Sequence, residues 1–295
     1  MSPKSKDKIA TVVLYVISVL VVLLLVFFIG YILYKGASSL NFKFIFGNPK
    51  IDEAGGGIGP MLFNSFYLLI VTLIFTVPLG VGAGIYLAEY AKEGKVMDLI
   101  RLCIDTMSSL PSIVVGLFGV LVFVQLTKWG FSLIAGALAI TILNLSSLTR
   151  VSENAIRSAS AGVKEASVGL GATQWQTIWK VVLPSAMPQI LTGIILSSGR
   201  IFGEAAALIF TAGSSTSNLN FNDISLVGRQ SAFSLFKPTE TLAVYIWKIN
   251  SEGVLPDASK VANGASAVLI LMVLIFNFSA RIIGRRIHRS FTGSK

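Results

Sequence analysis

Six stretches of this chain are long and apolar enough to cross a bilayer, and no other feature constrains the fold as much. A helix needs about 20 apolar residues to span roughly 30 Å of hydrocarbon. Because backbone polar groups find no water there, such spans must close their own hydrogen bonds as helices. We therefore expect an all-α membrane protein with six transmembrane helices, at about residues 9–34, 61–87, 106–126, 131–149, 186–211 and 264–283.

Composition excludes several classes of protein. Only 13% of the residues are charged, against about 25% in soluble domains. The net charge of +10 could suggest nucleic acid, but the basic residues sit at the ends of apolar spans, so no nucleic-acid partner is expected. One cysteine, Cys103, and one histidine, His288, cannot build a disulfide framework or a His/Cys metal site. No Walker A pattern occurs, so this chain is not expected to bind ATP through a P-loop.

Charge asymmetry predicts the orientation. Six spans place both termini on one side, together with residues 88–105 and 150–184; this side carries 15 Lys and Arg over 76 residues, and the opposite loops carry 8 over 82. The positive side is the cytoplasmic one. Lys4, Lys6 and Lys8 before the first span resemble a signal peptide, but the apolar run is too long and lacks a cleavage site.

The expected organisation has three parts. Residues 1–60 form an N-terminal span and external loop, 61–284 a core of five spans that includes the loop 150–184, and 285–295 a basic cytoplasmic tail. Small residues predict close helix contacts within the core, at Gly80, Gly84, Gly116 and Gly119. The apolar segment 241–249 is too short to span, which suggests an interfacial helix or a docking surface.

The loop 150–184 has helix signals of its own. Thr173 and Gln176 fit a capping box. Apolar residues then recur at helical spacing, which predicts one face made of Trp175, Ile178, Trp179 and Val182. Pro184 is expected to end this helix at Leu183. A first short helix at 164–168 is broken by glycines. Periodicity alone leaves open an amphipathic helix that only lies on the headgroups.

A charged pair lies inside the fifth predicted span. Arg200 and Glu204 are four residues apart, so on one helix they can share a face and neutralise each other. An arginine near the bilayer centre costs at least about 2.5–3.5 kcal/mol. Either the two form a buried ion pair that fixes packing, or they line an anion pathway, where Arg200 binds a tetrahedral oxyanion. Ser197 and Ser198 would add hydroxyl donors.

The polar loop closely resembles the EAA loop of ABC importer permeases. The matching positions, at the family's spacing, are Glu165, Ala166, Gly171, Val181 in place of isoleucine, Leu183 and Pro184. The resemblance implies that this loop docks into a cleft on an ATPase subunit, with Glu165 meeting basic or polar groups. It also implies that Gly171 allows a bend and that the Trp175 face packs on the membrane domain.

Further stretches resemble the A-type permease of the phosphate-specific (Pst) ABC importer, in the MetI-like family. They are 55–69, 80–91, 110–119 and 197–213, the last with the family's Gly199, Arg200, Gly203 and Glu204; Ala205 and Ala206 depart from its usual residues. The resemblance implies a type I importer permease fold with cytoplasmic coupling helices, in a bacterial plasma membrane. The implied partners are a second, C-type permease, two ATPase subunits that hold ATP and Mg²⁺, and an extracytoplasmic phosphate-binding protein. No cofactor is implied on this chain.

Other functions stay open. A permease for sulfate, molybdate or phosphonate would share most of these features. An ion-driven secondary carrier usually shows acidic residues in several spans and inverted repeats, and neither is visible here. A membrane enzyme would need a nucleophile, a metal site or an acid–base cluster. The sequence therefore predicts a transporter subunit that is not itself an enzyme.

Overall fold

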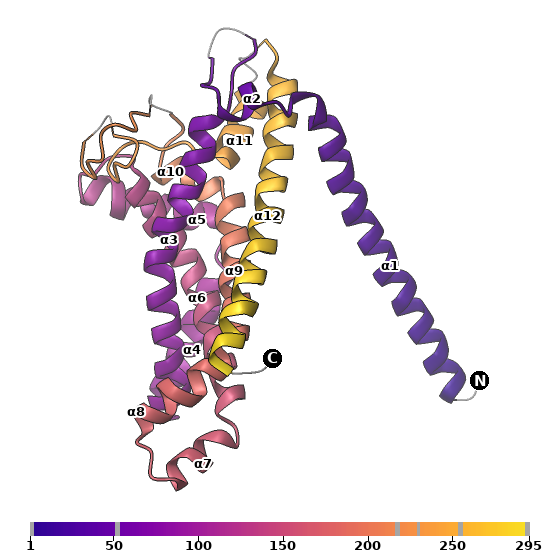
Figure 1. Cartoon of the computed structure of the whole chain (residues 1–295), viewed down its shortest axis with the longest axis vertical. Coiled ribbons are helices and arrows are strands. Elements are labelled where there is room, and N and C mark those ends of the chain that lie inside the picture. Colours follow the sequence, from indigo (N-terminus) through magenta and orange to yellow (C-terminus); the bar gives the residue numbers. More distant parts are fainter. Residues whose placement is uncertain (1–2, 51–53, 216–218, 229–230, 253–255, 293–295) are drawn as a thin grey trace.

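Four long helices run side by side along the long axis of the computed structural model (Figure 1). They are α3 (Gly59–Ile85), α6 (Leu133–Ser160), α9 (Leu183–Gly203) and α12 (Ala258–Thr292). The structure describes residues 3–50, 54–215, 219–228, 231–252 and 256–292, which contain no strand beyond one isolated bridge between Asn220 and Ser231. The predicted all-α membrane fold is confirmed.

Small residues bring these helices close together. A Cβ atom placed on Gly84 of α3 would lie 2.5 Å from the Cβ of Ser152 on α6, and one on Gly80 would lie 3.0 Å from the Leu148 side chain. No larger side chain fits at such distances without a shift of the backbone. The predicted role of the glycines in close packing is therefore confirmed for α3 against α6.

The first helix, α1 (Pro3–Gly36), stands apart from the bundle (Figure 1). None of its most apolar stretch is buried. It contacts the rest of the chain at its C-terminal end, where a Cβ on Gly36 would lie 2.4 Å from the Cβ of Ala267 on α12. An apolar helix without a buried face needs lipid or another subunit around it.

The third predicted span is not a straight helix from residue 106 to 126. The chain forms α4 (Lys95–Ser108), then α5 (Ser112–Gly119), which continues as the π-helix η3 (Val120–Leu126), with a bend of 100° between the two parts. Pro111 stands at the N-cap of α5. Proline disfavours helical geometry at the preceding residue, and this explains the break. The described residues thus hold five helices long enough to span, or six if the bent pair counts as one.

The fourth and sixth spans are longer than predicted, and short elements complete the two ends of the bundle. The shorter elements are η1 (Ala37–Ser39), α2 (Phe42–Phe46), the π-helix η2 (Tyr86–Tyr90), α10 (Ala206–Thr211) and α11 (Leu242–Glu252). The apolar segment 241–249 is thus helical, and Tyr245 and Ile249 pack in a core with Phe44 and Val261. Most of this segment is buried in the fold, whereas Trp247 is 48% exposed.

Both chain ends lie at one end of the bundle. The N-terminal end of α1 and the C-terminal end of α12 are at the end that carries α7 and α8, whereas α2 and α11 mark the opposite end (Figure 1). We call these the coupling-loop end and the α11 end. Of the predicted tail, residues 285–292 continue α12, and residues 293–295 lie outside the described residues.

Candidate translocation segment and coupling loop

The helix that carries Arg200 ends before Glu204, so the fifth predicted span is broken. Gly203 is the last residue of α9, Glu204 is extended (φ −76°, ψ 124°), and α10 begins at Ala206. The Glu204 Oε1 atom accepts the backbone N–H of Ala207 at 3.1 Å. Arg200 lies in the last turn of α9, where the helix dipole favours a cation, and Glu204 lies before α10, where it favours an anion. The break therefore suits both charges.

The expected pairing of Arg200 with Glu204 is wrong. Among the described residues, no ion pair within 4.0 Å and no hydrogen bond involves the Arg200 side chain, which is exposed. The two residues do not share a helix, because the chain leaves helical geometry at Glu204. A buried ion pair that fixes packing is therefore excluded as the reason for Arg200.

Polar side chains lie close to Arg200. Ser197 and Ser198 are both buried, and the Ser198 hydroxyl donates to the Ile194 carbonyl at 2.8 Å, so its proton is already engaged. Across from them, the Nδ2 atom of Asn277 on α12 lies 4.0 Å from the point where a Cβ on Gly199 would stand. The Asn277 Oδ1 atom is buried without a hydrogen-bond partner. This turn of α9 therefore faces an unsatisfied amide.

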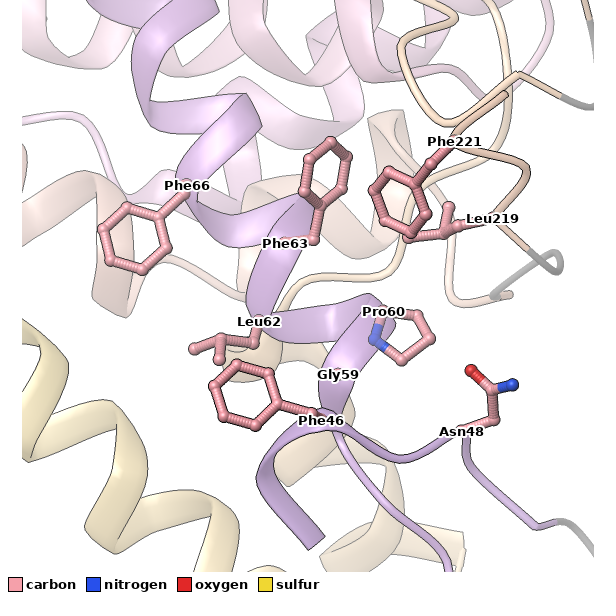
Figure 2. Close-up of a pocket in the computed structure, with 9 residues that line it drawn as sticks. All are labelled: Phe46, Asn48, Gly59, Pro60, Leu62, Phe63, Phe66, Leu219 and Phe221. Atoms are coloured by element: carbon pink, nitrogen blue, oxygen red, sulfur yellow. The ribbon is translucent and has the colours of Figure 1, made fainter. Parts of the chain in front are cut away.

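An apolar hollow near the α11 end has a different chemistry. It has a volume of about 450 Å³ and is lined mostly by aromatic and aliphatic side chains (Figure 2). Phe63 meets Phe221 edge to face, with ring centroids 5.1 Å apart. Among the described residues that line it, the only polar side chain is that of Asn48. Because it offers no cation, this hollow is a poor anion site compared with the Arg200 turn.

The loop between α6 and α9 forms two short helices joined by a glycine bend. They are α7 (Val163–Gly169) and α8 (Gln174–Thr177). Gly171 between them has φ +88°, a conformation that favours glycine. The predicted capping box is confirmed, since the Thr173 side chain accepts from the Gln176 N–H and the Gln176 side chain accepts from the Thr173 N–H. Glu165 and Ala166 are exposed on α7.

The prediction that Pro184 ends the helix is wrong. The helix continues from α8 through the π-helix η4 (Ile178–Val182) into α9, so that Gln174–Gly203 forms one 30-residue helix. Within the π turn, the Leu183 N–H donates to the Ile178 carbonyl, five residues back. Proline lacks an N–H and crowds the preceding turn. A π turn just before Pro184 moves the carbonyl groups that would clash with the proline ring in a regular α-helix. Val181, Leu183 and Pro184 are half-buried there.

The expected packing of the Trp175 face on the membrane domain holds for Ile178 and Val182 but not for the two tryptophans. Trp175 is 62% exposed and Trp179 is 45% exposed, while Ile178 and Val182 are fully buried. The two indole rings contact each other, with centroids 5.2 Å apart. Ile178, which lies between the tryptophans, and Val182, which follows them, face the bundle instead. An exposed tryptophan pair, with Leu170 at 90% exposure nearby, presents an apolar surface at this end.

A buried glutamate that sequence reasoning missed anchors this loop. Glu89 lies in η2, directly after α3, and its side chain is 1% exposed. Its Oε2 atom accepts from the Lys164 ammonium at 2.7 Å, and its backbone carbonyl accepts from the Gln174 side chain at 3.0 Å. The first residue lies on α7 and the second on α8. Glu89 therefore ties both short helices to the end of α3.

A second missed residue, Glu153, joins α6 to α4. Its carboxylate is 3% exposed and lies 3.3 Å from Arg101 on α4, with Arg150 at 3.6 Å and Arg157 at 3.2 Å on its own helix. Arg150 also pairs with Asp105 of α4, and Arg157 donates to a backbone carbonyl of η2 at 3.2 Å. Three cations on one buried carboxylate fix the base from which the coupling loop emerges.

These features define a multi-pass membrane permease, and the comparisons with known proteins identify its family. Residues 80–293 match the family described as binding-protein-dependent transport system inner membrane component. The chain belongs to this family, so it is a permease subunit of an ABC importer in the bacterial inner membrane. Probable ABC transporter permease protein YqgI of Bacillus subtilis is 50% identical over all of both chains. Phosphate transport system permease protein PstA of Pasteurella multocida is 31% identical over 84% of this chain and 83% of its own length.

Solved structures show the same fold. The permease of a bacterial alginate ABC transporter superposes with a TM-score of 0.61 at 15% identity, covering 96% of this chain and 98% of that one. The MetNI methionine ABC transporter gives a TM-score of 0.56 at 18% identity, over 78% and 94% of the two chains. These likenesses confirm the predicted MetI-like importer permease fold.

Proposed function

We propose that this chain transports inorganic phosphate, as one half of the translocation pathway of an ATP-driven importer. The observation that carries the proposal is the Arg200 guanidinium, which is exposed and has no partner among the described residues although it lies within a hydrophobic span. A forked cation suits a tetrahedral oxyanion. The likeness to PstA proteins supports phosphate as that anion.

Glu204 gives the proposed pathway its selectivity. Its Oε1 atom is engaged by the N–H of Ala207. The Oε2 atom would accept a hydrogen bond from a protonated phosphate oxygen and repel sulfate, which carries no proton at neutral pH. Ser197 lines the pathway with Arg200. The engaged proton of Ser198 leaves its oxygen as an acceptor. In an importer of sulfate, molybdate or phosphonate, Arg200 would still bind the anion, whereas Glu204 would not act to select phosphate.

The coupling loop connects this pathway to one of two ATPase subunits, which bind ATP and Mg²⁺ in their own sites. Support comes from the exposed surface of the loop, with Glu165, Leu170 and Trp175 directed outward, and from its anchoring by Glu89. A docking surface needs exposed apolar anchors and charges on a rigid base. The excess of basic residues at this end supports a cytoplasmic location of the loop and of both termini.

The assembly that we propose has a second, C-type permease opposite the Arg200 turn and an extracytoplasmic phosphate-binding protein at the α11 end. The pathway would lie between the two permeases, since the Arg200 side chain is exposed when this chain is without a partner subunit. An ion-driven secondary carrier would not need an anchored loop of this kind.

The test is uptake into proteoliposomes that contain the whole importer. We expect ATP-dependent uptake of labelled phosphate but not of labelled sulfate. Arg200→Gln should abolish uptake, and Glu204→Gln should reduce the preference for phosphate over sulfate. Arg286→Gln, on the exposed end of α12, is the matched control. Uptake of sulfate equal to that of phosphate would refute the phosphate assignment, and normal phosphate uptake in Arg200→Gln would refute the pathway.

A further inference from the structure

A cavity of about 280 Å³ lies between α9 and α12, toward the coupling-loop end of the bundle. One wall comes from α9 and is mainly apolar, and the other comes from α12 and is basic. The lining residues are Pro188, Leu191, Thr192, Ile195, Arg281, Gly284 and Arg285. The α9 residues of the cavity lie before Arg200 in sequence, from Pro188 to Ile195, and Arg200 itself does not line it.

The floor of the cavity depends on a glycine. A Cβ atom on Gly284 would lie 3.2 Å from the Cδ1 atom of Leu191, so a larger residue would force the helices apart or fill the space. The Thr192 hydroxyl already donates to the Pro188 carbonyl at 2.9 Å. The two arginines are therefore the side-chain donors that the cavity offers to a ligand.

Arg281 and Arg285 are one turn apart on α12, and like charges at this spacing destabilise a helix. Among the described residues neither has an ion pair with a carboxylate. Two neighbouring guanidiniums without a carboxylate partner cost little free energy only where an anion binds them or water solvates them. Their position, at the end of the apolar run of α12, is the level of the lipid headgroups.

We propose that this cavity binds an anionic phospholipid, with its phosphate on Arg281 and Arg285 and an acyl chain along Leu191 and Ile195. Basic pockets between transmembrane helices suit such headgroups, and guanidinium forks suit phosphate oxygens. The apolar α9 wall favours a lipid over free phosphate, because inorganic phosphate has no apolar part that could contact it. The bound lipid fastens α12 to α9, the helix that continues into the coupling loop.

The experiment measures lipid binding by the purified full chain with its partner subunits, by native mass spectrometry and by the apparent melting temperature with added phosphatidylglycerol or phosphatidylethanolamine. We expect retention of phosphatidylglycerol over phosphatidylethanolamine. The double variant Arg281→Gln, Arg285→Gln should bind phosphatidylglycerol roughly 30-fold more weakly, at about 1 kcal/mol for each basic residue. Arg286→Gln, which is adjacent but does not line the cavity, should bind like the wild type.

Three outcomes would overturn the proposal. The double variant and Arg286→Gln could lose binding equally, which would mean a diffuse surface charge. Inorganic phosphate at millimolar concentration could stabilise the lipid-free Arg200→Gln variant, which lacks the proposed transport site, as much as phosphatidylglycerol does, which would assign the cavity to the free ion. Finally, the double glutamine variant could bind phosphatidylglycerol as tightly as the wild type, which would show that these arginines hold no lipid. The double replacement by lysine, which preserves charge, serves as the control for a folding defect. None of these results depends on which anion the importer carries.

Discussion

Replacing Glu153 by glutamine removes one buried charge that three arginines share. The carboxylate is 3% exposed, while the side chains of Arg101, Arg150 and Arg157 are 25%, 29% and 41% exposed. The amide of glutamine keeps the shape and one acceptor, but it leaves three cations without their common partner. Glu153→Gln is therefore expected to destabilise the base of the coupling loop without creating a cavity.

The magnitude follows from burial. Removing one partner of a fully buried ion pair costs about 3–5 kcal/mol, whereas an exposed pair is worth about 0.2–1 kcal/mol. Here the carboxylate is buried but the guanidiniums reach water, so we expect about 2–3 kcal/mol. At about 2–4 °C per kcal/mol for a chain somewhat smaller than this one, the melting temperature should fall by roughly 5–10 °C.

The assay is the apparent melting temperature of the purified chain in one detergent at one scan rate, because unfolding of large proteins is often irreversible. Asp105→Asn is the matched control: Asp105 also pairs with Arg150, but its side chain is 58% exposed, so the loss should stay within about 1 kcal/mol. Arg101→Gln should destabilise the Glu153→Gln variant less than it destabilises the wild type. In the variant it removes one of the cations that the lost carboxylate leaves unbalanced. A shift for Glu153→Gln no larger than that of Asp105→Asn would refute this account of the cluster.

Three further predictions follow from other contacts. Gly84→Val should abolish folding or lower the melting temperature by more than Glu153→Gln does, because its Cβ would lie 2.5 Å from Ser152, and a stable, native-like variant would contradict the close packing. Burial lowers the pKa of Lys237 to about 8; protonation therefore costs stability below pH 8, and this cost, up to about 3 kcal/mol, disappears as the pH rises toward 10.5. The melting temperature should then rise between pH 8 and 10 more in the wild type than in Lys237→Met, and parallel pH profiles would refute this. Glu89→Gln should reduce ATP-driven uptake while leaving membrane insertion intact, because Lys164 loses its ion pair at 2.7 Å, and unchanged uptake would contradict the anchoring role.

Features that depend on local spacing were predictable from the sequence. Apolar length located the first, second, fourth and sixth spans, Thr173 and Gln176 located the start of α8, and the EAA spacing located the bend at Gly171. These signals act within a few residues, so one sequence contains them. The same is true of the small residues at Gly80 and Gly84, since helical spacing alone places them on neighbouring turns.

Features that depend on distant partners were not predictable. The break after Gly203 places Ala207 of α10 against α5, where a Cβ on Gly116 would lie 2.8 Å from the Ala207 Cα atom. Glu89 meets Lys164, 75 positions later, and Glu153 meets Arg101, 52 positions earlier. From the sequence, each of these charged residues at the end of a span is interpreted as a contact with the lipid headgroups. Their burial follows from packing between helices, which spacing along the chain does not encode.

The largest difference between expectation and structure bears directly on mechanism. A helix that ended at Leu183 would have separated the coupling loop from the fifth span by a joint. The structure instead continues one helix from Gln174 to Gly203, passing Pro184 by means of the π turn. Trp175 and Arg200 therefore lie on one rod, roughly 38 Å apart at 1.5 Å per residue. A rigid rod transmits a displacement of the loop to the Arg200 turn without loss, whereas a joint would absorb it. Since α9 ends three residues after Arg200, the helix is interrupted at Glu204 and Ala205, on the far side of the proposed anion site. Movement of the loop would thus shift Arg200 relative to Glu204, which α10 holds against α5, and would open or close the space between the two charges.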